Sequence, residues 1–162
     1  NFIFPAGAAL GKATVTAGVA SGEVHVESVA PGLFSMNATG SGVAAATGVR
    51  IAADGTQSPV TVFECGAAGG SCVAVPIDLG PPDDRIILSL YGTGMRAGQG
   101  QATATIGGVF VPVAGPVAQD QYAGLDQVNL GPLPQSLIGR GEVPVVLTVD
   151  GKTANSVTVR FR

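Results

Sequence analysis

Apolar and polar residues alternate along several short stretches of the chain, with the period of two that is typical of half-buried β-strands. The last stretch is the clearest, because Val157, Val159 and Phe161 alternate with polar or charged residues. Comparable stretches, rich in Val, Ile and Thr, lie at residues 86–91, 102–106, 109–113 and 143–149. The pattern therefore predicts a series of short strands in the second half of the chain.

Glycine-containing turns separate these predicted strands. Gly107-Gly108 and Asp150-Gly151 each lie between two apolar alternations, and such pairs favour tight hairpin turns because these residues adopt positive φ. Residues 112–134 are rich in Pro and Gly, and we interpret them as a break between strands. We expect residues 85–162 to form one complete small β-sandwich.

Strands are also predicted before residue 81. Two alternating stretches lie in residues 13–26, and we expect the second strand to begin after Ser21-Gly22. Asp54-Gly55 is a further turn signal. Other β-rich stretches lie at residues 49–52, 60–63 and 73–79.

The beginning of the chain resembles its end. Asn1 corresponds to Asn129 and Gly11 corresponds to Gly139, both at an offset of 128 residues. In both places two alternating strands follow, and the turn between them is longer in the second copy. We interpret residues 1–29 and the end of the chain as two copies of one repeat unit. The first copy lacks its opening strands, so residues 1–29 cannot be a whole domain.

Cys65 and Cys72 are the two cysteines of the chain. They flank the stretch Gly-Ala-Ala-Gly-Gly-Ser between two predicted strands, an arrangement that suits a disulfide closing a hairpin loop. Loop entropy for so short a ring corresponds to about 2–3 kcal/mol. Two ligands alone make a poor zinc site, and the spacing is not that of a Cys-x-x-Cys motif. A disulfide favours an oxidising, extracytoplasmic location.

The segment Gly-Pro-Pro-Asp-Asp at residues 80–84 is the best linker candidate, because paired prolines extend the backbone and adjacent acids favour solvent. We therefore expect three parts in the chain. These are a partial Ig-like repeat with a disulfide hairpin module at residues 1–80, a linker at 81–84, and a complete Ig-like β-sandwich at 85–162. The alternative is a bend within one continuous sandwich.

Composition supports an all-β fold and excludes several classes of partner. Charged residues are only 12% of the chain, against about a quarter in a usual soluble protein. Val, Thr and Gly are abundant whereas Glu, Lys and Leu are scarce, which favours strands. The net charge is −3, and no basic patch is interleaved with aromatic residues, so nucleic acid is not an expected partner. No run reaches the roughly 18 apolar residues of a membrane span, and no signal peptide is visible.

Four segments of the second half are similar to one known family. They are Leu90-Tyr91-Gly92-Thr93-Gly94, Ala104-Thr105-Ile106-Gly107-Gly108, Gly124-Leu125-Asp126-Gln127-Val128-Asn129 and Val145-Val146-Leu147-Thr148-Val149-Asp150-Gly151. Together they resemble the immunoglobulin-like C-terminal domain of large secreted acidobacterial proteins, often called the Solibacter-type C-terminal domain. Residues 30–34 and 54–55 resemble the linker module of that family. The Gly-Thr-Gly and Ile-Gly-Gly spacing is also similar to the broader IPT/TIG group.

The resemblance implies a secreted or surface-displayed bacterial β-sandwich, appended to longer repeat-bearing chains and without a known activity. It implies no catalytic or ligand-binding residue and no cofactor. Family members have strands before the Asn-Phe motif, and this chain begins at that motif. Either the chain is a fragment, or another molecule provides the missing edge.

Candidate catalytic and metal-binding residues are few. His25 is the only histidine, and it lies between Glu23 and Glu27 on the polar side of a predicted strand, with no nucleophile beside it. Asp83 and Asp84 are candidate calcium ligands, although they also suit a solvated linker. We therefore expect neither enzymatic activity nor a cofactor.

One further motif, the sequon Asn37-Ala38-Thr39, is interpreted as a turn rather than as a glycosylation site.

Two functions follow from this scaffold. The first is a non-catalytic structural protein of a filament, surface layer or stalk, built by β-strand addition between copies. The uncharged segment Asn1-Phe2-Ile3-Phe4 is the candidate donor strand. The second is a C-terminal recognition or anchoring module of a larger secreted protein that binds a cell-surface or glycan ligand. Its candidate contact residue is Tyr122, in the loop region 112–126.

Overall fold

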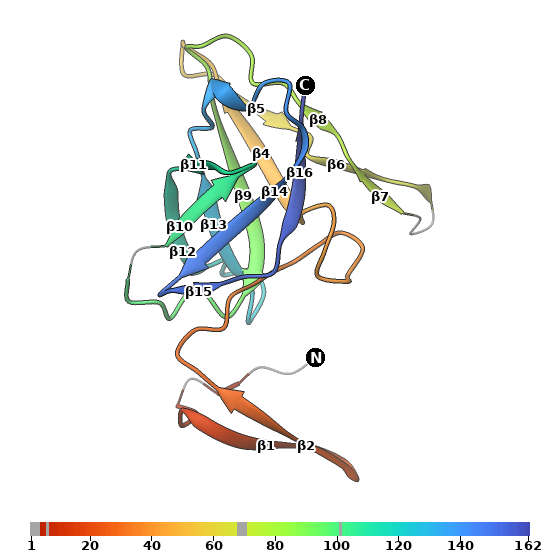
Figure 1. Cartoon of the computed structure of the whole chain (residues 1–162), viewed down its shortest axis with the longest axis vertical. Helices are drawn as coiled ribbons and strands as arrows, with labels where there is room; N and C mark the ends of the chain where they lie inside the picture. Colours follow the sequence, from red (N-terminus) through yellow and green to blue (C-terminus); the bar gives the residue numbers. More distant parts are fainter. Residues whose placement is uncertain (1–3, 6, 68–70, 101) are drawn as a thin grey trace.

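The computed structural model describes residues 4–5, 7–67, 71–100 and 102–162, and these residues form an all-β protein with several antiparallel sheets (Figure 1). Two six-stranded sheets make the body, and two separate hairpins project from it. The 3-10 helix η2 (Gln135–Leu137) lies between strands β13 and β14. The described residues include no helix with the length and hydropathy needed to cross a membrane.

The first six-stranded sheet has the order β12-β13-β9-β4-β5, and β3 pairs with β9 at its end. All of its pairs are antiparallel. The strands are β3 (Gly32–Leu33), β4 (Ala46–Ile51), β5 (Gln57–Val60), β9 (Arg85–Thr93), β12 (Val113–Ala118) and β13 (Asp126–Leu130).

The second six-stranded sheet has the order β11-β10-β14-β16-β8, and β15 pairs with β14. The pairing of β16 with β8 is parallel, whereas the other pairs are antiparallel. The strands are β8 (Pro76–Ile77), β10 (Thr103–Ile106), β11 (Val109–Val111), β14 (Gly141–Val149), β15 (Lys152–Thr153) and β16 (Val157–Phe161).

Both sheets contribute to one hydrophobic core. Alternate residues of each strand are buried, as in β9, where Ile86, Leu88 and Leu90 are at most 1% exposed and their neighbours along the strand are more exposed. In the second sheet β16 buries Val157 and Val159 in the same way. The period-two pattern of the sequence thus marks the faces that turn inward.

Most of the predicted strands of the second half are confirmed, but β12, β13 and the two-residue strand β15 were missed. The structure places β12 and β13 in residues 112–134, which the Pro and Gly content had marked as a break. Strand β13 is central, because it pairs with both β12 and β9. Its alternation is hidden in the sequence because the first buried position is the carboxylate Asp126 rather than an apolar residue.

Residues on both sides of 81–84 pair within the same sheet. Strand β4 lies next to β9 over six residue pairs. Arg50 of β4 also holds the intervening segment, because its guanidinium donates hydrogen bonds to the Asp78 carbonyl at 2.6 Å and to the Asp84 carboxylate at 2.7 Å. Asp83 is exposed, but the Asp84 side chain retains only 12% exposure. This segment is therefore bound to the body of the protein.

Asp126 anchors the loop that follows β9. Its side chain is 1% exposed and accepts hydrogen bonds from the backbone N–H groups of Met95, at 2.7 Å, and Arg96, at 3.2 Å. The Arg96 guanidinium forms an ion pair with the other carboxylate oxygen. A buried carboxylate is tolerated because several donors replace its water.

We expect Asp126→Ala to lower the free energy of unfolding by about 2–4 kcal/mol, because two backbone donors and a guanidinium would lose a buried acceptor. Urea denaturation followed by circular dichroism measures this change. Asp83→Ala, which removes an exposed carboxylate, is the matched control and should change stability by less than about 0.5 kcal/mol. Equal effects of the two substitutions would contradict the role given to Asp126.

Candidate functional site

The hairpin of β1 (Gly11–Ala17) and β2 (Ala20–Val26) stands apart from both six-stranded sheets (Figure 1). Its seven residue pairs run from Gly11 opposite Val26 to Ala17 opposite Ala20. The turn is therefore Gly18-Val19, and the predicted break at Ser21-Gly22 was wrong. Gly18 has φ +61°, which glycine adopts without strain, so this residue can reverse the chain.

The two faces of the hairpin differ in chemistry. Lys12 and Glu23 form an exposed ion pair, 3.4 Å apart, on the polar face. Val15, Val24 and the other apolar residues occupy the opposite face and are at best half-buried. A shallow hollow of about 290 Å³ on this face is lined by Val15, Ala17, Ala20, Ser21, Gly22, Glu23 and Val24. The apolar face is thus accessible to solvent.

The base of the hairpin is fixed to the body. Glu27 forms an ion pair with Lys152 of β15, and Val29 is 1% exposed within the core. The Ala30 N–H donates a hydrogen bond to the Gly94 carbonyl at 2.9 Å. Gly94 has φ +71° and lies so close to the Ala30 carbonyl that no Cβ would fit. These contacts hold the root of the hairpin while its tip extends away from the sheets.

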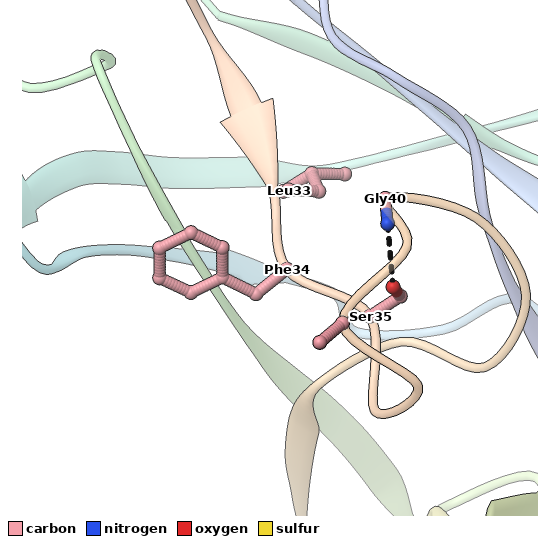
Figure 2. Close-up of a pocket in the computed structure, with 5 residues that line it drawn as sticks. Leu33, Phe34, Ser35 and Gly40 are labelled. Carbon is pink, nitrogen blue, oxygen red and sulfur yellow. Dashed lines mark hydrogen bonds between the residues drawn. The ribbon is translucent and has the colours of Figure 1, made fainter. Parts of the chain in front are cut away.

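A second hollow, of about 280 Å³, lies beside the loop that follows β3 (Figure 2). It is lined by Leu33, Phe34, Ser35, Ala38 and Gly40. Figure 2 shows the Ser35 side chain turned toward Gly40, whose N–H donates to the Ser35 hydroxyl at 3.0 Å. The Phe34 ring is 44% exposed. No titratable side chain lines this hollow, so it offers no acid, base or charged nucleophile.

Asn155 clamps the same loop to the second sheet. Its amide oxygen accepts a hydrogen bond from the Leu33 N–H at 2.8 Å, and its amide nitrogen donates to the carbonyls of Leu33, at 2.9 Å, and Gly40, at 2.6 Å. Asn155 carries no local signal in the sequence, because its partners lie more than a hundred positions away along the chain.

The sequon residue Asn37 organises a turn within this loop. Its side-chain oxygen accepts hydrogen bonds from the Ser35 hydroxyl at 2.7 Å, the Thr39 N–H at 3.1 Å and the Thr39 hydroxyl at 2.9 Å. Asn side chains in turns commonly form hydrogen bonds of this kind with groups nearby in the chain. The geometry agrees with the interpretation of 37–39 as a turn.

The predicted disulfide is confirmed. Cys65 and Cys72 are bonded, with their Cα atoms 4.0 Å apart, and they close the hairpin of β6 (Phe63–Cys65) and β7 (Cys72–Ala74). This hairpin projects from the side of the body (Figure 1). Its root is anchored by Val62, which is 2% exposed.

The other candidate residues do not come together in one site. Asn1, Phe2 and Ile3 of the candidate donor strand lie outside the described residues, and Phe4 is 44% exposed. Tyr122 is 68% exposed in the loop between β12 and β13. His25 is exposed on β2, opposite Lys12. Across the described part of the chain, no three His, Cys, Asp or Glu side chains gather as metal ligands.

Asp78 is one of the few acids whose ionisation the fold changes. The Arg162 guanidinium, through a hydrogen bond to the carboxylate, holds the pKa of Asp78 below its usual value of 3.8, and the Gly80 N–H adds to this effect. The pKa of Asp54 is lowered as well, chiefly by the Thr56 N–H, which donates to it at 2.8 Å. Both groups lie at the surface and serve to fix loops.

Comparison with known proteins identifies no family. No protein-family model matches the chain, and neither a curated protein nor a solved structure matches it significantly. The chain is an all-β protein with several antiparallel sheets and a disulfide-closed hairpin.

We expect Asp78 to contribute to the pH dependence of stability. Because its folded pKa lies below the unfolded value, its contribution is complete above about pH 4 and is lost as the pH falls through the folded pKa. Asp78→Asn should therefore flatten the fall in the urea midpoint between about pH 4 and pH 2. Arg162→Gln should act in the same direction, and the double variant should add nothing further. A full additional effect in the double variant would contradict this pairing.

Proposed function

We propose that this protein is a non-catalytic structural module of an extracellular assembly, such as a filament, surface layer or stalk, whose copies join through the β1–β2 hairpin. The observation that carries this proposal is the open apolar face of a hairpin that belongs to neither six-stranded sheet. An isolated two-stranded hairpin is at best marginally stable in water, and three or more strands, or packing against another layer, are needed. The hairpin therefore needs strands from elsewhere.

The internal repeat indicates what a completed hairpin looks like. By the 128-residue offset, β1 corresponds to residues 139–145, most of which lie in β14. The turn that follows is longer in the second copy, so β2 corresponds to β16, the next strand that pairs with β14 over its length. In this fold β14 pairs on its outer side with β10, and β16 pairs on its outer side with β8. Their apolar residues Val145, Val157 and Val159 are fully buried against the other sheet. The corresponding residues of β1 and β2 have no such cover among the described elements.

Three other features support this function. The disulfide between Cys65 and Cys72 suits an oxidising compartment outside the cytoplasm. A body made of two packed β-sheets is consistent with the Ig-like sandwich inferred from the sequence, a fold common in extracellular arrays. A low content of charge also favours extensive contact between copies, because few charged groups lose water when surfaces meet.

Recognition of a cell-surface or glycan ligand is a second candidate function. The observation that favours it is the exposure of Tyr122, 68%, at the end of the body where β12 and β13 are joined. An exposed aromatic ring is the kind of side chain on which a sugar can stack. The loop, residues 119–125, contains no second aromatic residue on which a sugar could stack, so the hairpin carries the stronger argument.

Val15→Asp tests the proposed function, because it places a carboxylate in the centre of the apolar face. We expect the purified chain to form assemblies larger than one chain, measured by light scattering on a size-exclusion column and by negative-stain electron microscopy. The variant should be monomeric with unchanged thermal unfolding of the body. Val19→Asp is the matched control, because Val19 is fully exposed at the hairpin tip, and it should assemble normally. A monomeric parent protein at every concentration would overturn the proposal.

A further inference from the structure

We propose that two copies join edge to edge, with β1 pairing antiparallel to β1 of the second copy about a two-fold axis at Thr14. This inference rests on the proposed function and specifies the strand, the register and the symmetry of the joint. It follows from the protection of the edges of the two six-stranded sheets, from the direction of the free backbone groups on β1, and from the distribution of charge between β1 and β2.

The edges of the two six-stranded sheets are poorly suited to strand addition. In the first sheet, edge strand β5 contains Pro59, and edge strand β12 contains Pro116 and a register shift between Ala114 and Val117. In the second sheet, β8 has two residues and begins with Pro76, and β11 has three residues. Proline, irregular pairing and shortness are the features that prevent a further strand from pairing. The body of the protein is thus closed at its edges.

Strands β1 and β2 are different, because each has seven residues and no proline. The two residues that flank a two-residue hairpin turn form a hydrogen-bonded pair. Along an antiparallel ladder, such residue pairs alternate with pairs that exchange no backbone hydrogen bond. Ala17 and Ala20 flank the turn, so Thr14 and Glu23 form a non-bonded pair. The N–H and C=O groups of Thr14 therefore point toward the free edge of β1, and those of Glu23 point toward the free edge of β2.

Charge selects the edge of β1. Symmetric pairing of two β2 strands about their central residue would place Glu23 opposite its own copy, and like charges in that position are destabilising. Symmetric pairing of two β1 strands places Thr14 opposite Thr14 and Lys12 opposite Thr16, with no charge facing a like charge. Opposed threonines are a favourable cross-strand pair.

This register pairs β1 over its whole length. Directly opposed residues of an antiparallel pair share a face of the sheet, so the apolar faces of the two hairpins become one surface on a four-stranded sheet in the order β2-β1-β1-β2. The outer edges are then the two β2 strands, which carry Glu23 and His25 and are followed by Glu27. A two-fold joint uses the same patch on both copies and closes, so it produces a dimer as the building unit of any larger assembly.

Cysteine substitution tests the register directly. In the proposed joint the two Thr14 Cα atoms are about 5.5 Å apart, which is within reach of a disulfide. Thr14→Cys should give a covalent dimer on a non-reducing gel after mild oxidation. Thr16→Cys is the matched control, because each Thr16 lies opposite Lys12 and the two Thr16 residues are displaced by roughly 13 Å along the strands. Equal cross-linking of both variants, or none with Thr14→Cys, would overturn the register.

Proline substitution tests the choice of edge. Thr14→Pro and Glu23→Pro each remove an N–H that points outward, at β1 and β2 respectively, and leave the hydrogen bonds between the two strands in place. Light scattering should give a dimer for the parent protein and for Glu23→Pro, and a monomer for Thr14→Pro. Because the hairpin lies outside the core, unchanged thermal unfolding would verify that each variant body is folded.

The remaining outcomes separate this inference from the proposed function. An open polymer that Val15→Asp abolishes but Thr14→Pro does not would retain the proposed function and overturn the two-fold β1 joint. Loss of assembly on deletion of residues 1–5, with Thr14→Pro still assembling, would instead identify Asn1–Phe4 as the joining strand. A monomeric parent protein would overturn both proposals.

Discussion

The structure depends on the burial of one apolar face by each β-sheet. Exposing the apolar side of a sheet to water costs free energy, and in the body the two six-stranded sheets avoid this cost by sharing one core. Leu88, Leu130 and Leu147 are fully buried in it. The β1–β2 hairpin has the same alternation but no facing sheet among the described elements. The property that stabilises the body is therefore also the property from which we infer association through the hairpin.

A few polar side chains position the loops around this core. Asp126 holds the segment after β9, Asn155 holds the loop after β3, and Arg50 holds the segment between β8 and β9. Each joins parts of the chain that are at least 28 positions apart. Such contacts add specificity to the fold, because the aliphatic core by itself favours burial without selecting one loop conformation.

The contrast between protected and open edges links the fold to the proposed function. Prolines at 59, 76 and 116 lie in strands at the edges of the two sheets, where a missing N–H costs no ladder hydrogen bond within the fold. The same residues would obstruct pairing with another molecule. On the hairpin, where the edges carry no proline, charge is unevenly distributed between the two strands. In the proposed function, association is therefore directed away from the edges of the two sheets and toward the β1–β2 hairpin.

The all-β class, most strand positions and the disulfide could be predicted from the sequence, because each depends on local signals. Period-two alternation marks a half-buried strand, Gly107-Gly108 and Asp150-Gly151 mark turns, and two cysteines across a short loop favour a bond. Strand β13 was missed because its first buried residue is Asp126, whose donors come from a distant loop. The turn at Gly18-Val19 was misplaced because Ser21-Gly22 carries an equally good local turn signal.

Only the tertiary structure decided which strands lie side by side. The pairing of β4 with β9, the clamp formed by Asn155 and the protected edges depend on contacts between residues far apart in the sequence, where no local pattern operates. Alternation of apolar and polar residues indicates that a strand has an apolar face, but it does not indicate which element covers that face. In the body, each six-stranded sheet covers the apolar face of the other. For β1 and β2 the sequence determined an apolar face, and the tertiary structure left that face without a facing sheet among the described residues.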